Sequence, residues 1–79
     1  MNLPSKLLRP DQYGNYWLGL SHQSCAAIFP AKAKEAPRGH FIASFGGDRG
    51  FLFDGPKLAY FQCPEQALRH MQSLVAETN

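Results

Sequence analysis

The fold is decided by residues 41–75, which read FIASFGGDRGFLFDGPKLAYFQCPEQALRHMQSLV. The first half of this stretch consists of short apolar runs separated by turn residues. Residues 46–50 contain three glycines, which adopt the positive φ angles of tight hairpin loops without steric cost, and Asp54-Gly55-Pro56 is a common turn sequence. We therefore predict a three-stranded antiparallel meander formed by residues 41–45, 51–53 and 58–61.

The second half of the stretch predicts an amphipathic helix that begins at Pro64. Proline is well tolerated in the first turn of a helix, and Glu65 beside it complements the helix dipole. A short helix is marginal in water on its own, so its apolar face should pack on the sheet. That face, at the i, i+3, i+4, i+7 spacing, consists of Ala67, Leu68, Met71, Leu74 and Val75.

Two more strands are expected before the meander. Residues 16–20 are rich in aromatic and apolar side chains, and residues 25–29 form an apolar run that Pro30 ends. The second of these runs also suits a short helix, and periodicity does not separate the two alternatives over so few residues. Residues 21–24 would connect the two strands, and residues 30–39 would form the longest internal loop.

Together these elements predict an α+β fold, with a small antiparallel sheet of three to five strands packed against one C-terminal amphipathic helix. Residues 1–79 should form a single compact domain, with residues 1–14 as an irregular N-terminal lead-in. A chain of 79 residues is too short for two domains. Hydrophobic residues make up 44% of it and aromatic residues 13%, which is enough for one core.

Composition narrows the setting of the protein. The formal net charge of +2 is too small to mark a nucleic-acid binder by bulk electrostatics. The apolar runs are far shorter than the roughly 20 residues that span a bilayer, and no apolar run that would resemble a signal peptide follows Lys6 and Arg9. We therefore expect a cytoplasmic protein. In that setting Cys25 and Cys63 are more often reduced and buried than joined in a disulfide.

No residue pattern predicts catalysis or a cofactor. The metal-ligand candidates are His22, Cys25, His40, Cys63 and His70, but they do not form two closely spaced pairs. We expect the cysteines in the core and the histidines at the surface. A cysteine just before a helix can have a lowered pKa, yet packing or capping is the commoner role. The sequence therefore predicts a protein that is not an enzyme and binds no metal.

The glycine-rich turn and the acidic residues have structural explanations. Residues 46–50 lack the Lys-Ser/Thr pair of a phosphate-binding loop and should join two strands, so we reject that reading. Asp48 and Asp54 occupy turns, where aspartate is a common residue, and we do not interpret them as an acid–base pair.

Binding is the class of function that remains. Several strands carry large apolar residues on both faces, as in Phe41 and Ile42 or Tyr60 and Phe61, whereas one helix covers only one face. The lead-in, a partner protein or a second copy of the chain would have to cover the rest, because large exposed apolar patches usually mark interfaces. Trp17 is expected in the core rather than at a contact.

In size and layout, from the strand at Tyr16 to the helix opened by Pro64-Glu65-Gln66-Ala67-Leu68, the chain resembles the small phage-encoded anti-CRISPR proteins. The resemblance implies a stoichiometric inhibitor, in the cytoplasm of a bacterial host, that docks on a CRISPR surveillance complex and blocks target DNA binding or nuclease recruitment. Many such inhibitors are strongly acidic, whereas this chain is slightly basic.

A basic chain would need its own polar contacts to a host protein complex. We predict partner-binding residues in the loop at 30–39 and the turn at Arg49, and these residues are Lys32, Lys34, Arg38, Arg49 and Tyr13. The alternative is a small nucleic-acid-binding or antitoxin-like regulator, in which the same cations contact phosphates and Tyr13, Tyr16 or Trp17 stack on bases. Glu35 and Asp48 interrupt the positive field, which favours a solvated loop over a phosphate-binding surface. A homodimer is compatible with either alternative.

Overall fold

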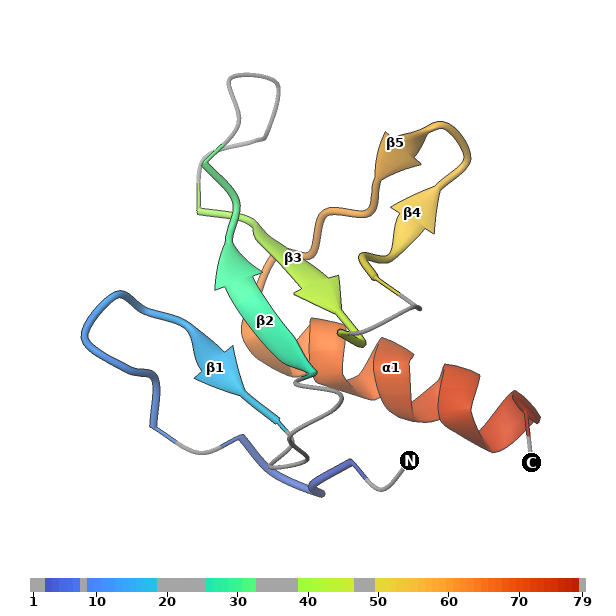
Figure 1. Ribbon diagram of the computed structural model, residues 1–79, viewed down its shortest axis with the longest axis horizontal. Helices are drawn as coiled ribbons and strands as arrows, with labels where there is room; N and C mark the ends of the chain where they lie inside the picture. The colour runs from blue at the N-terminus through green and yellow to red at the C-terminus, as the bar shows by residue number, and fades with distance from the viewer. Residues whose placement is uncertain (1–2, 8, 19–25, 33–38, 47–49, 79) are drawn as a thin grey trace.

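The computed structural model describes residues 3–7, 9–18, 26–32, 39–46 and 50–78 (Figure 1). It confirms the α+β fold. The elements in chain order are β1 (Tyr16–Trp17), β2 (Ala27–Pro30), β3 (Phe41–Ser44), β4 (Phe53–Asp54), β5 (Lys57–Leu58) and α1 (Pro64–Thr78). The strands β1, β2 and β3 form one antiparallel sheet in that order, and β4 pairs with β5 in a second.

The register of the main sheet settles the ambiguity in residues 25–29 in favour of a strand. Ile28 pairs with Tyr16 on one side and with Ala43 on the other. The ladder continues beyond the strands, because Leu18 N–H donates to Ala26 O at 2.8 Å and Ala31 N–H donates to His40 O at 2.9 Å. Cys25 lies outside the described residues.

Pro30 is the last residue of β2, so the strand runs one residue past its predicted end at Phe29 and the loop begins after Pro30. It stands opposite Phe41, whose own N–H and C=O both bond to Phe61 on the other side of β3. A residue at the position of Pro30 therefore donates no N–H hydrogen bond to β3. A sheet tolerates proline at such a position because no hydrogen bond of the ladder is lost.

The predicted three-stranded meander does not form as one sheet, because the return segment 58–61 is divided between the β4–β5 hairpin and β3. Phe45 N–H donates to Gly50 O, and Phe51 forms a bridge opposite Ser44 beside β3. Residues 53–58 then leave β3 as the hairpin β4–β5, which projects from the main sheet in Figure 1. Phe61 returns to β3 and exchanges hydrogen bonds of 2.7 and 2.8 Å with Phe41. Residues 58–61 are thus not one continuous strand.

The projecting hairpin has the turn that its sequence predicts. Gly55 has a φ of 67° and Pro56 follows it, between the paired residues Asp54 and Lys57. Glycine at the first central position of a two-residue loop suits a type II′ turn, whose twist matches that of the two strands.

The core lies between the main sheet and α1. The helix packs on β3 and β2 and passes behind them in Figure 1. The predicted apolar face is confirmed, because Ala67, Leu68 and Met71 are buried and Leu74 and Val75 are partly buried against the same cluster. The sheet and its flanks contribute Leu18, Ala26, Ile28, Ala43 and Phe45.

The beginning and the middle of α1 are tied to neighbouring segments. At its beginning, Gln66 Oε1 accepts a hydrogen bond of 3.2 Å from Gln62 N–H, which satisfies a donor just outside the first turn. Farther along, Gln72 Nε2 donates to Pro4 O at 2.8 Å. Leu3 and Leu7 pack against the core from the lead-in. The described part of the lead-in therefore adds apolar cover beside the helix.

Candidate partner-binding face

Side-chain alternation assigns the large residues of the main sheet to two faces. Tyr16, Ile28 and Ala43 stand opposite one another and belong to the core cluster, so they face α1. Their neighbours in sequence must point the other way, because successive side chains in a strand alternate between faces. We call this second set the aromatic face, and it consists of Trp17, Phe29, Ile42 and Phe51.

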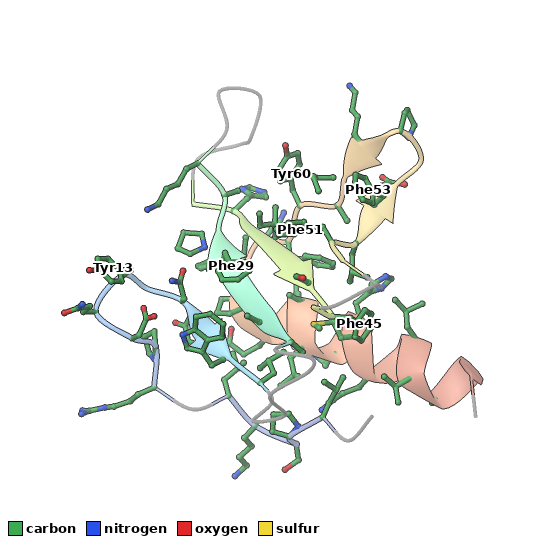
Figure 2. The ribbon with its side chains drawn as sticks, in the orientation of Figure 1. Tyr13, Phe29, Phe45, Phe51, Phe53 and Tyr60 are labelled. Atoms are coloured by element: carbon green, nitrogen blue, oxygen red, sulfur yellow. The ribbon has the colours of Figure 1, made fainter. Side chains whose placement is uncertain are left out.

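Three rings of the aromatic face form a continuous row. The centroids of Trp17 and Phe29 are 5.8 Å apart with planes at 87°, and those of Phe29 and Phe51 are 6.2 Å apart at 57°. Both distances lie in the range of favourable aromatic pairs, each worth about 0.5–1.5 kcal/mol beyond area burial. Figure 2 places Phe29 and Phe51 over the two central strands. The row therefore holds its rings in a defined arrangement.

The outer two rings of the row remain open to solvent. Trp17 is 44% exposed and Phe51 is 43% exposed, whereas Ala27 on the same face is fully buried. Ala27 and Ser44 occupy the paired positions between the two exposed rings on this face. Neither residue carries a charge. The result is an uncharged aromatic surface on the side of the sheet opposite α1.

The expectation that Trp17 belongs to the core is wrong. Trp17 and Tyr16 occupy successive positions of β1, so only one of them can face the helix, and that residue is Tyr16, which contacts Phe41 edge-on at 6.2 Å. Alternation along residues 16–20 places Tyr16 on the same face as Leu18 and Leu20, and Trp17 on the face of Gly19, so the sequence pattern favours Tyr16 for burial. The pairing of Trp17 with Ala27 decides the matter.

A tight turn beside β1 holds the indole of Trp17. Asp11 Oδ2 accepts a hydrogen bond of 2.9 Å from Trp17 Nε1, and Asp11 Oδ1 accepts bonds of 2.8 and 3.0 Å from the N–H groups of Tyr13 and Asn15. The bond from Trp17, followed by the bonds within the turn, lowers the pKa of Asp11 below its ordinary value. The carboxylate is therefore the charged form that the turn requires.

Of the partner-binding residues predicted from sequence, the structure describes two. Tyr13 lies in the turn organised by Asp11 and is 67% exposed, and Figure 2 shows it at the outer end of that turn. Lys32 is exposed just beyond the end of β2. Lys34, Arg38 and Arg49 lie outside the described residues, as do His22 and Asp48.

The residues considered for metal binding or catalysis are scattered in the described ranges. The ring of His70 contacts the ring of Phe61 at 5.5 Å on α1, and Cys63 is a free, half-buried thiol before the helix. His40 directly precedes β3, whose first residue, Phe41, pairs with Phe61. Over the residues that the structure describes, no group of three His, Cys, Asp or Glu side chains is placed to hold a metal ion.

Two hollows lie away from the aromatic face. One, of about 300 Å³, is at the base of the β4–β5 hairpin and is lined by Phe53, Asp54, Ala59, Tyr60, Phe61 and His70. The other, of about 430 Å³, lies between the lead-in and α1 and is lined by Ser5, Lys6, Leu7, Glu65, Leu68, Arg69 and Gln72. Phe53 is 61% exposed, which adds a large apolar group at the hairpin.

Compared with protein families, curated proteins and solved structures, the chain shows no significant match to any of them. Within the described ranges, no helix combines the length and the apolar character needed to cross a lipid bilayer.

Proposed function

We propose that the chain acts by non-catalytic binding to a partner protein through the aromatic face. The observation that carries this proposal is the row of Trp17, Phe29 and Phe51, which come from three segments of the sheet and leave two rings over two fifths exposed. Exposed aromatic residues that are already packed in place are typical of binding hot spots, and tryptophan is the residue most enriched there. Contiguous exposed apolar surface usually marks an interface.

The size of the face indicates which part of an interface it would supply. A large aromatic side chain has a surface of about 150–250 Å². Trp17 is 44% exposed and Phe51 is 43% exposed. Each of them would therefore offer roughly 65–110 Å² of surface to a partner. A standard interface buries about 800 Å² on each side. The aromatic face would therefore form the centre of the interface. Tyr13 and Lys32, which are both exposed, would contribute to its polar rim.

The partner that we propose to test first is a bacterial defence complex, with a CRISPR surveillance complex as the specific candidate. The resemblance to anti-CRISPR proteins in size and layout supports this choice. Binding would be stoichiometric, and it would inhibit the complex by covering the surface that receives target DNA or a nuclease. Lys32, Lys34, Arg38 and Arg49 would then contact acidic residues of the complex around the aromatic centre.

Nucleic-acid binding is the second candidate, because open sheet faces with exposed rings also stack single-stranded bases. Most of the affinity for a nucleic acid comes from cations that neutralise phosphates, which makes it fall steeply with salt. The four residues of the aromatic face, Trp17, Phe29, Ile42 and Phe51, include no cation that could neutralise a phosphate. A protein partner, whose interface centre is depleted in charge, fits this surface better.

The test compares two double variants of the tagged chain. Trp17→Ser with Phe51→Ser alters the aromatic face, and Glu65→Gln with Arg69→Gln alters exposed positions on α1 as a matched control. Each is used to capture proteins from a bacterial lysate, and then titrated with a purified CRISPR surveillance complex and a single-stranded DNA fragment at rising salt.

The proposal expects the wild type and the control to bind one protein complex with equal affinity and the aromatic variant to lose it, with all three chains folded by circular dichroism. Equal binding by the aromatic variant would refute the proposed surface. Tight DNA binding with a steep salt dependence, and no protein partner, would instead establish the second candidate.

A further inference from the structure

The hydrogen-bond acceptor sites of the Asp11 carboxylate are all occupied by donors of the chain itself. Besides the three short bonds to Trp17 Nε1, Tyr13 N–H and Asn15 N–H, its Oδ2 accepts a longer bond of 3.4 Å from Asn15 Nδ2. A carboxylate offers about four acceptor sites, so these four donors occupy it fully. Asp11 is therefore ill suited to bind a metal ion or a partner's donor directly, and its role must be internal.

The bond to Asp11 uses the only hydrogen-bond donor of the indole ring of Trp17. An indole ring has one N–H and no acceptor, and in Trp17 that N–H is bonded to Asp11. The part of Trp17 that reaches solvent, 44% of the side chain, thus presents ring carbon to a partner. The ring of Phe29 meets the indole in a T-shaped arrangement, at 5.8 Å between centroids.

The turn that carries Asp11 is itself fixed to the sheet. Asp11 N–H donates to Asn15 O at 2.9 Å, and Gly14 N–H donates to Asp11 O at 3.0 Å. Gly14 has a φ of 83°, and a Cβ at this position would lie 3.4 Å from Cγ of Pro30 at the end of β2. The turn therefore packs against β2 in a conformation that favours glycine.

We propose that Asp11 is a positioning residue that fixes the indole of Trp17 on the aromatic face before a partner arrives, so that the partner meets Trp17 through apolar contacts alone. This inference rests on the proposed function, because it concerns the same surface. A side chain that is held in advance loses less freedom on binding, which raises affinity. The partner surface at this point should accordingly be apolar or aromatic, with no acceptor directed at the indole.

The decisive variant is Asp11→Asn, because it separates the two roles of the carboxylate. Its side-chain oxygen can still accept the bonds from Tyr13 and Asn15, since asparagine forms the same kind of turn. Its NH₂ group would then face the indole N–H, so that two donors oppose each other and the bond to Trp17 is lost. The backbone bonds of the turn stay, and the two bonds accepted by Oδ2, from Trp17 Nε1 and the longer one from Asn15 Nδ2, are removed.

The chain has one tryptophan, so a single indole N–H resonance and one fluorescence signal report on it. Asp11→Asn should make the indole N–H exchange faster with water and make Trp17 easier to quench with acrylamide. The dye 1-anilinonaphthalene-8-sulfonate, an anionic amphiphile with aromatic rings, serves as the binding probe. Its affinity should fall about two- to tenfold, the factor expected for ordering one side chain on binding.

A double-mutant cycle separates positioning from general stability. Trp17→Phe keeps a ring and removes the donor, so Asp11→Asn in that background should not weaken dye binding further. The inference is overturned if Asp11→Asn leaves indole exchange and dye affinity unchanged, or if affinity falls only in proportion to the fraction of unfolded chain. It is also overturned if Asp11→Asn weakens the Trp17→Phe variant as much as the wild type.

Failure of the proposed function gives a different pattern. If the variant Trp17→Ser with Phe51→Ser binds the dye as well as the wild type, the aromatic face is not a binding surface and both proposals fail. If that variant loses the dye and Asp11→Asn does not weaken it, the face stands and only the role of Asp11 is rejected.

Discussion

Two isoleucines on neighbouring strands provide the sharpest test of which sheet face the helix covers. Ile28 on β2 faces α1 and is fully buried, whereas Ile42 on β3 belongs to the aromatic face and is half-buried. Replacing either with alanine removes three carbon atoms. At Ile28 the lost transfer free energy is about 2.5 kcal/mol, at about 0.8 kcal/mol per methylene. The cavity raises the expected loss of unfolding free energy to about 2–5 kcal/mol.

At Ile42 the loss should be smaller, about 1 kcal/mol, because part of the side chain is already exposed to water and a partial gap at the surface can fill with solvent. A chain of 79 residues is expected to have an unfolding free energy of about 4–12 kcal/mol. Ile28→Ala therefore removes a large share of the stability, and Ile28→Val, with an expected loss of about 0.5–1.5 kcal/mol, extends the series if the alanine variant does not fold.

The assay is urea unfolding followed by circular dichroism at the helix band. With a slope of about 1–3 kcal/mol per molar urea, a loss of about 3 kcal/mol lowers the midpoint by about 1–3 M. The reasoning is refuted if Ile42→Ala is as destabilising as Ile28→Ala. That result would mean that the helix, or something else, covers the aromatic face as well.

Three further variants or conditions probe the surroundings of the face. Gly14→Ala should lower the unfolding free energy by about 1–2 kcal/mol, because its φ of 83° is strained for alanine, and Gly14→Asn should lower it less; equal melting temperatures would contradict this. Because the folded pKa of Asp11 lies below 3.8, the indole N–H signal of Trp17 should stay constant from pH 8 to pH 5, and it should change only below 3.8, where the carboxylate is protonated; a change near neutral pH would contradict the assigned bond. Replacing Cys25 and Cys63 together with serine should leave partner binding unaltered, and complete loss of binding by a folded variant would instead indicate a thiol or metal site.

The sequence predicts most of the fold because its local signals agree with one another. Pro64 and the spacing of Ala67, Leu68 and Met71 define the helix and its buried side. The glycine-containing turns separate the strands of the meander. The sequence does not predict how residues 58–61 are divided. Phe61 pairs with β3 at the part of its edge that remains open once β4 has turned away from it.

The candidate site is harder to predict because it depends on which face of β1 meets the helix. Alternation with Leu18 and Leu20 favours Tyr16 for the core, whereas the large ring of Trp17 by itself favours burial, and the strand pairing shows that alternation decides. The role of Asp11 is also missed, although Asp11, Gly14 and Asn15 are recognisable as turn residues. Their spacing predicts a turn, but the bond to Trp17 depends on the direction in which the chain enters β1.

The most direct test of binding through the aromatic face is acrylamide quenching of Trp17 fluorescence, measured with and without the partner protein recovered in the capture experiment. Trp17 is the only tryptophan of the chain and is 44% exposed in the free protein. If the partner lacks tryptophan or is labelled with a non-emitting analogue, the signal comes from this residue alone. Binding through the aromatic face predicts that complex formation strongly protects Trp17 from the quencher. A fully formed complex in which Trp17 is quenched as readily as in the free chain would contradict it.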